Sequence, residues 1–320
     1  NVYTRQKVTA MQHPCESSIQ RQRRILVDAL SNELAPGQEW SVLDFPDHSN
    51  IGDSAIWVGE YAVLKGIAGR EASYVASCSD DDLAAERWAS VPGQIFLHGG
   101  GNFGDLYPMH QNYRLDVLRA LPGRRIVQMA QSIHFSDRSG VKATADAIKA
   151  HGNFCFFARD RKTYDFASEA FECEVKMVPD GAFGLGPLKR TVKPTIGTLE
   201  FRREDIEAVG GSIPGSVDWP LEGFDEARKL RWPGAIHHVL HGNFSKSSRR
   251  RAGLNAVAQW RLERGLALLS SAERIICDRL HVHILSTLLG IPHQFTDNST
   301  GKISAYYETW THDCSVAKPL

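Results

Sequence analysis

Short apolar runs alternate with longer amphipathic stretches along most of this sequence, and this alternation restricts the possible folds more than any other feature. The apolar runs have the length of buried strands, and helical periodicity follows most of them. The expected strands span residues 41–45, 94–98, 125–130, 154–158, 175–178, 195–201 and 274–277. Such alternation predicts strand–helix units, and therefore an α/β fold with parallel sheets covered by helices on both faces.

The segment at residues 184–194, GLGPLKRTVKP, is the best candidate for a domain boundary, because it is rich in glycine, proline and basic residues. A strand pattern begins again directly after it. With 320 residues, the chain is long enough for two domains of ordinary size. We therefore expect two Rossmann-like domains, at residues 1–185 and 186–320, that face each other across a cleft.

Composition argues against several classes of protein. Lys+Arg and Asp+Glu both number 37, so there is no basic excess of the kind that nucleic-acid binding requires. No apolar run approaches the length of a membrane span, and the first residues lack a signal-peptide core. The six cysteines show no CxxC spacing. From this pattern we expect free thiols in a reduced, cytoplasmic protein, with neither disulfide bonds nor zinc.

The stretch IFLHGGGNFGDLY at residues 95–107 contains a glycine pattern, Gly99-x-Gly101-x-x-Gly104, that is typical of dinucleotide-binding proteins. In those proteins the helix begins within the pattern. Pro108 would then lie inside that helix, although proline fits better in the first turn of a helix that begins later. The next strand also lacks an acidic residue at its end. We therefore predict a glycine loop for a different ligand, with a tight turn that binds nothing as the alternative.

The stretch at residues 276–310 begins at a predicted strand end and continues into a helix that closes at Gly290. Asp278 is placed to cap this helix, which puts Arg279 and His281 near its start. A helix start attracts anions through its free amides, and a guanidinium adds a two-point grip on carboxylate or phosphate. The sequence therefore predicts an anion pocket at this point.

Several motifs, taken in order along the chain, resemble those of the polysaccharide pyruvyl transferase family, and most closely its bacterial exopolysaccharide branch. The resemblance extends over most of the chain. Its motifs are Asn50-Ile51-Gly52-Asp53, His98-Gly99-Gly100-Gly101-Asn102, Gln131-Ser132-Ile133, Ala158-Arg159-Asp160, Pro179-Asp180, Arg202-Arg203, Asp278-Arg279-Leu280-His281, Asn298 and Lys302. Two residues depart from the pattern, since Ala130 stands where a proline is expected and Gly181 where a larger residue is expected.

The resemblance implies a two-domain fold similar to the glycosyltransferase-B type. It also implies transfer of the pyruvyl group of phosphoenolpyruvate onto two hydroxyls of one sugar, which gives a cyclic ketal in a cell-surface glycan. Phosphoenolpyruvate is then a co-substrate, and no cofactor or metal is expected. The expected partner is a sugar or a lipid-linked oligosaccharide, through which the protein could contact a membrane peripherally. Arg279, His281 and Arg159 are implied as donor contacts.

Phosphoenolpyruvate carries a carboxylate and a phosphate, so its site needs several cations. The donor-binding candidates are Arg159, Arg202, Arg203, Arg279, His281 and Lys302. Of these, we expect Arg279 and His281 to be catalytic, with His281 protonating the methylene carbon or orienting the phosphate. The candidates for lining the cleft or binding the acceptor are Asn50, Gly52, Asp53, Gly99, Gly100, Gly101, Asn102, Asp105 and Asn298.

The donor candidates also have purely structural interpretations. Arg279 could pair with Asp278 or Glu273 on a solvated face, and His281 could be a core histidine. A metal pair of His281 and His283 is not expected, because residues two apart on a helix point to opposite sides.

Arg202 and Arg203 could likewise be surface charges, and Asp53 and Asp105 could be helix caps. For the whole protein, two alternatives stay open: a sugar-nucleotide glycosyltransferase of the same fold, and a non-catalytic glycan-binding relative.

Overall fold

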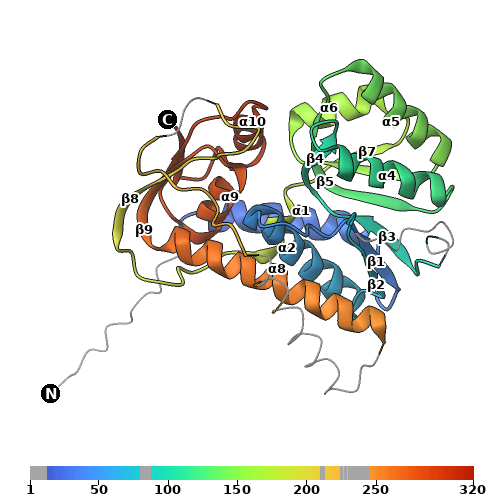
Figure 1. Cartoon of the computed structure of the whole chain (residues 1–320), viewed down its shortest axis with the longest axis horizontal. Helices are drawn as coiled ribbons and strands as arrows, with labels where there is room; N and C mark the ends of the chain where they lie inside the picture. The colour runs from blue at the N-terminus through green and yellow to red at the C-terminus, as the bar shows by residue number, and fades with distance from the viewer. Residues whose placement is uncertain are drawn as a thin grey trace.

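The structure is a computed structural model that describes residues 13–79, 88, 90–209, 213–223, 226, 229 and 245–320. It contains two parallel β-sheets with helices packed around them (Figure 1). The α/β class predicted from the alternation of apolar runs is therefore confirmed. None of the helices in these ranges is both long and apolar enough to cross a membrane.

The first sheet has the strand order β2-β1-β3-β5-β6-β7, with β4 beside β5. Its strands are β1 (Trp40–Leu43), β2 (Tyr74–Val75), β3 (Gln94–Leu97), β4 (Gly100–Gly104), β5 (Ile126–His134), β6 (Phe154–Ala158) and β7 (Glu174–Met177). Val42, Phe96, Val127 and Cys155 lie in one row across four neighbouring strands. All four are buried, as expected for a parallel sheet with both faces covered.

Helices cover this sheet and continue the alternation. They are α1 (Glu16–Ser31), α2 (Ile51–Ala68), α4 (Pro108–Ala120), α5 (Arg138–His151) and α6 (Arg161–Ala170). Asn50 caps α2, because its side chain accepts a hydrogen bond from the Gly52 amide, and the helix ends at Gly69 with a φ of 65°. Pro108 occupies the first turn of α4, as the sequence predicted.

The second sheet has the order β11-β10-β9-β8, and all its pairings are parallel. Its strands are β8 (Ile196–Phe201), β9 (Ala272–Cys277), β10 (His293–Phe295) and β11 (Ala317–Pro319). The other elements are the 3-10 helix η1 (Gly181–Leu185), α8 (Lys246–Ser270), α9 (Leu280–Leu289), α10 (Lys302–Tyr306) and the π-helical turn η2 (Tyr307–Thr311).

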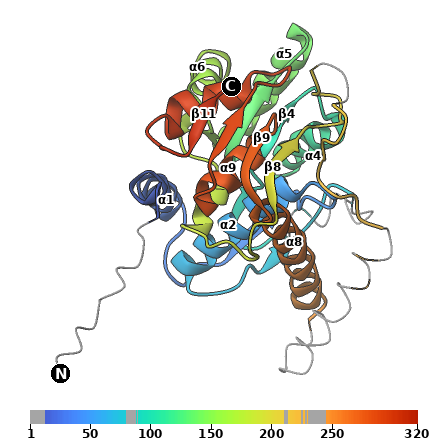
Figure 2. The same cartoon turned by 90° about the vertical axis from the view of Figure 1, so that its left-hand side faces the viewer.

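Helices α2 and α8 take part in the apolar cores of both sheets. Ile51 of α2 packs in the core around the second sheet, whereas Trp57 and Leu64 of the same helix pack in a core of the first sheet. Leu254 and Leu262 divide α8 in the same way. Figure 1 shows α8 extending from β2 to beneath the second sheet, and in Figure 2 the same helix lies to the right of α2. The two sheets thus share helices as well as a linker.

The glycine pattern forms a strand where an open loop or a tight turn was predicted. Gly100 and Gly104 lie in strand β4 with φ values of 133° and 118°, which strongly favour glycine. A Cβ on Gly104 would lie 1.8 Å from the carbonyl oxygen of His134 in β5. These glycines therefore allow β4 to approach β5 closely, and the pattern is a strand rather than an open loop.

The prediction that Asp278 caps α9 is wrong. Arg279 occupies the N-cap position without a side-chain cap, and Asp278 accepts a hydrogen bond of 2.8 Å from the amide of Arg203 in the loop after β8. Asp278 therefore connects two strand ends instead of closing its own helix.

The expectation of six free thiols is also wrong, because Cys15 and Cys314 form a disulfide bond. Their positions are 299 residues apart in the sequence, yet their Cα atoms are 5.3 Å apart. The bond links the N-cap residue of α1 to the segment before β11. The free cysteines in the described ranges are Cys78, Cys155, Cys173 and Cys277.

Candidate active site

A cavity of about 440 Å³ is lined by residues that follow strands of both sheets. In parallel sheets, ligands bind beyond the carboxyl ends of the strands, and this cavity has that position. Its lining contains nine of the predicted site residues, which are Asn50, Asp53, Gly101, Asn102, Arg159, Arg203, Arg279, His281 and Lys302. The other lining residues are His48, Tyr107, His110, Asp205, Ile206, Glu207, Trp219 and Leu280.

Arg279 enters the cavity from the start of α9 and is held by two carboxylates. Its Nε and Nη2 atoms donate to the two carboxylate oxygens of Asp218, with 2.5 Å between Nη2 and Oδ2. Nη2 also lies 3.0 Å from an oxygen of Asp205. This two-point contact is the grip that a guanidinium gives to any carboxylate. The suggested pairs with Asp278 and Glu273 are not the ones that the structure forms.

His281 lies two residues further along, in the first turn of α9, and its ring approaches Asp180, which follows the first sheet. Its Nε2 atom is 3.4 Å from Oδ2 of Asp180, outside hydrogen-bond geometry, and has no hydrogen-bond partner within the described residues. Arg159 donates from Nη1 to the same carboxylate at 2.8 Å. Burial would raise the pKa of Asp180, but His281 and Arg159 hold it well below its usual range. Asp180 is therefore an ionised carboxylate beside the imidazole.

Gly52 of α2 makes room for the imidazole ring. A Cβ at this position would lie 2.3 Å from Nδ1 of His281 and 2.6 Å from its Cβ. The absence of a side chain at Gly52 therefore sets where His281 can lie.

Lys302 and Arg203 form a second cationic group on the same wall. Lys302 Nζ lies 2.5 Å from Glu207, and Arg203 contacts the same carboxylate at 2.9 Å. Tyr107 donates its hydroxyl to Glu207 at 3.0 Å, and Asn298 donates its side-chain amide at the same distance. Burial lowers the pKa of Lys302, and the negative charge of Glu207 opposes this effect. Asn298 thus supports Glu207 from outside the cavity lining.

The remaining predicted residues lie outside the lining. Arg202 pairs with Glu200 at 2.6 Å and donates to Thr296 at 2.7 Å. Asp105 accepts hydrogen bonds from the amide and hydroxyl of Ser136, so its contacts are structural.

Gly99 and Gly181 pack against Glu60, a buried carboxyl group beside His98. A Cβ on Gly181 would lie 2.4 Å from Cγ of Glu60, which explains why a larger residue is absent there. Burial raises the pKa of Glu60, while His98, 2.9 Å away, opposes this effect. Gly100 lies near Asp53, whose carboxylate would be 3.4 Å from an added Cβ.

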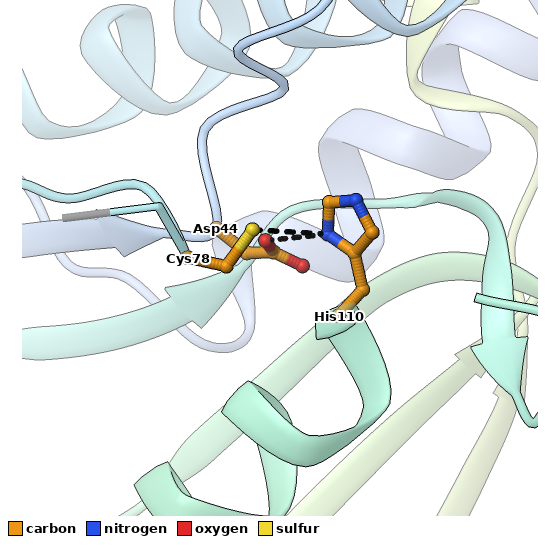
Figure 3. Close-up of side chains that lie close together, drawn as sticks. All are labelled: Asp44, Cys78 and His110. Carbon is orange, nitrogen blue, oxygen red and sulfur yellow. Dashed lines mark hydrogen bonds and ion pairs between the residues drawn. The ribbon is translucent and has the colours of Figure 1, made fainter. Parts of the chain in front are cut away.

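Two further histidines of the cavity lining, His48 and His110, were not predicted from the sequence. His110 lines the cavity from the first turn of α4, and its Nδ1 atom is 2.8 Å from Asp44 and 3.5 Å from Cys78. Figure 3 shows both groups approaching the same ring nitrogen, with the other nitrogen directed away from them. Burial would lower the pKa of His110, but hydrogen bonding to Asp44 raises it to about 10. The sequence offered one indication of this group, because the acidic residue Asp44 lies near the end of a predicted strand, where site residues are expected.

Asp44 has a φ of 68°, which is a left-handed conformation that non-glycine residues rarely adopt. Such strain persists where surrounding contacts enforce it, and it is concentrated at functional sites. The conformation places the Asp44 carboxylate against His110.

Asp44, Cys78 and His110 are also the residue types that bind zinc, and their donor atoms lie within 4.8 Å of one another. However, the buried guanidinium of Arg114 lies 3.9 Å from Asp44. A dication would therefore face a fixed positive charge, and we interpret the group as hydrogen-bonded. His283 contacts His293 and Thr311, each at 2.8 Å, so it forms no metal pair with His281.

Comparisons with known proteins agree with these motifs. A family model described as polysaccharide pyruvyl transferase matches residues 50–300. Pyruvyl transferase 1 of Schizosaccharomyces pombe is 34% identical in an alignment 321 residues long, which includes 94% of this chain and 77% of that protein. EpsO of Bacillus subtilis, which also carries a pyruvyl transferase name, is 30% identical over 275 residues, covering 83% and 84%.

The fold has a counterpart among solved structures. KP1_0663, an uncharacterized protein from Klebsiella pneumoniae, superimposes with a TM-score of 0.57 over 94% of this chain and 98% of that one. At 18% identity the likeness concerns the fold alone. The family match over residues 50–300 has the wider meaning: this chain belongs to the polysaccharide pyruvyl transferase family and is an enzyme of that type.

Proposed function

We propose that this enzyme transfers the pyruvyl group of phosphoenolpyruvate onto two hydroxyls of one sugar, forming a cyclic ketal in a cell-surface glycan and releasing phosphate. The observation that carries the proposal is the convergence of four cationic side chains and one histidine on a single cavity. Arg159, Arg203, Arg279, Lys302 and His281 reach it from both sheets. A small ligand with one carboxylate and one phosphate matches this charge pattern.

The proposed chemistry begins with proton transfer from His281 to the methylene carbon of phosphoenolpyruvate. The neighbouring carbon becomes cationic, and the first sugar hydroxyl forms a bond to it while its proton returns to the imidazole. The second hydroxyl then bonds to the same carbon, and phosphate leaves with that hydroxyl's proton. Asp180 would stabilise the protonated imidazole, because it is an ionised carboxylate 3.4 Å from Nε2. No redox cofactor enters this scheme.

We assign the acceptor to the part of the cavity that residues 1–185 line. His110, Tyr107, Asn102 and Asp53 provide hydrogen-bonding groups there, and Trp219, from the second half of the chain, adds an aromatic surface to the same cavity. Sugar rings need such a mixture of polar groups and a flat apolar face. The acceptor itself would be a free sugar or a lipid-linked oligosaccharide.

We further propose that the two sheets correspond to two Rossmann-like domains of a glycosyltransferase-B-like enzyme, with residues 1–185 bearing the acceptor side and 186–320 the donor side. The position of the cavity between strand ends of both sheets supports this division.

The disulfide of Cys15 and Cys314 favours an oxidising compartment over the cytoplasm that the cysteine pattern predicted, since reducing compartments rarely maintain such bonds.

Phosphoenolpyruvate should bind in the absence of any sugar nucleotide. A ligand that binds only the folded state raises the melting temperature by mass action. We expect an increase with phosphoenolpyruvate and none with common sugar nucleotides, followed by phosphate release when a panel of glycosides is added. The reverse pattern of melting shifts would favour a sugar-nucleotide glycosyltransferase.

Gly52→Ala should slow phosphate release by about tenfold or more, because the added methyl would displace the His281 ring and small displacements of a catalytic group have large effects. The matched control is Gly66→Ala in the same helix, where an added Cβ meets nothing within 4 Å. That variant should keep full activity and gain up to about 1 kcal/mol of stability. Equal kinetics for the two variants would show that Gly52 does not position His281.

A further inference from the structure

Carboxylates from the segment after β8 neutralise three of the four cations of the cavity. Asp218 and Asp205 contact Arg279, Asp205 also contacts Arg203 at 2.7 Å, and Glu207 contacts Arg203 and Lys302. The three cations therefore face three carboxylates of the same chain. A ligand with a carboxylate or phosphate has to enter a site where these contacts are already occupied.

The contact between Arg279 and Asp218 has the geometry of ligand recognition. Both carboxylate oxygens are engaged by Nε and Nη2, as the carboxylate of a small acid would be. Asp218 also accepts hydrogen bonds from the amides of Glu204 and Trp219 at 2.9 and 2.7 Å. Asp218 therefore keeps its hydrogen bonds from these two backbone amides when the guanidinium binds another anion.

The three carboxylates differ in how readily water can replace their partners. The side chain of Asp205 is 37% exposed and that of Asp218 is 14% exposed, whereas Glu207 is 2% exposed. Burial would raise the pKa of Asp205, but Arg203 and Arg279 lower it to about 2, so it stays charged. Glu207 is also fixed by Tyr107 and Asn298. The exchangeable partners of Arg279 are thus Asp218 and Asp205.

We propose that Asp218, assisted by Asp205, is an internal competitor that occupies the anion contact of Arg279 until a substrate anion displaces it. An anion with one charged group exchanges one guanidinium–carboxylate contact for a similar one and gains little. An anion that also reaches Arg159, Lys302 or His281 gains contacts that Asp218 does not make. The carboxylates therefore lower the affinity for every anion that uses Arg279, so that only an anion with contacts beyond Arg279 binds tightly and a single anion such as product phosphate is poorly retained.

The test measures binding of phosphoenolpyruvate, pyruvate and inorganic phosphate to the full chain by calorimetry at constant ionic strength. Asp218→Asn keeps the shape of the side chain and removes its charge, so affinity for each anion that uses Arg279 should rise by about tenfold. Asp205→Asn should shift affinity in the same direction by a smaller factor. The matched control is Asp165→Asn, which removes an exposed partner of Arg161 and should change nothing.

Unchanged or weaker binding of all three anions by both Asp218→Asn and Asp205→Asn would overturn the proposal and make these residues supports for Arg279. Asp205→Asn also serves if Asp218→Asn does not fold. The inference depends on the proposed function only for the identity of the natural anion. Tighter binding of pyruvate and phosphate without any binding of phosphoenolpyruvate would support Asp218 as an internal competitor and contradict phosphoenolpyruvate as the donor.

Discussion

Arg279→Lys should lower kcat/KM for pyruvyl transfer by roughly thirtyfold or more, equivalent to about 2 kcal/mol of transition-state stabilisation. Lysine keeps the positive charge but loses the planar pair of donors. In the structure Nε and Nη2 of Arg279 act together on one carboxylate, and no lysine can reproduce that contact. The measurement is the initial rate of phosphate release at several concentrations of phosphoenolpyruvate.

Arg274→Lys is a suitable control for this substitution. Arg274 lies in β9, on the same strand–helix unit, but it is exposed and its Nε donates to Thr198 at 2.7 Å, outside the cavity. Its replacement should leave the rate unchanged. If Arg279→Lys retained near-native kcat/KM, Arg279 would have no place in the donor site.

His281→Asn should reduce turnover by about a hundredfold or more while leaving phosphoenolpyruvate binding largely intact. Loss of a positioned proton donor usually has an effect of this size. Binding should persist because Arg159, Arg279 and Lys302 line the same cavity. The substitution removes the imidazole that acts as the acid in the proposed mechanism, whose Nε2 atom lies 3.4 Å from Asp180.

Melting temperature, binding of phosphoenolpyruvate and phosphate release, measured on one preparation, distinguish the roles of His281. A parallel loss of affinity and rate would make it a phosphate ligand. A loss of stability with normal activity in the folded fraction would make it a core histidine, and His283→Asn provides the reference for that behaviour because His283 is fully buried between His293 and Thr311. Unchanged kinetics in a well-folded variant would end the catalytic assignment.

The sequence predicted the parts of the fold that depend on local pattern. All seven predicted strands occur, as β1, β3, β5, β6, β7, β8 and β9. Strands β1, β3 and β6 are buried along their whole length, as continuous apolar runs predict, whereas β7 and β8 are partly exposed strands at the edges of their sheets. Strands β2, β10 and β11 were missed because they have only two or three residues. Strand β4 was missed because glycines disfavour strands unless close approach to a neighbour requires them.

The site was predictable where residues follow strands and unpredictable where partners come from elsewhere. Arg279 and His281 were found because they begin a helix after an apolar run. Their partners Asp218 and Asp180 lie 61 and 101 positions away, and no local spacing connects them. The disulfide was missed for the same reason, since a pair of cysteines at opposite ends of the chain has no sequence spacing to recognise.

The sharing of α2 between two apolar cores has a mechanical consequence. Ile51 lies in one core and Leu64 in the other, so rotation of one sheet against the other would bend the helix or expose side chains at one of its ends. Close-packed interiors resist such deformation. The Asn50 cap, at the start of this same helix, lines the cavity. The helix therefore opposes rotation of one sheet against the other, and the part of the cavity that Asn50 lines is fixed to both cores.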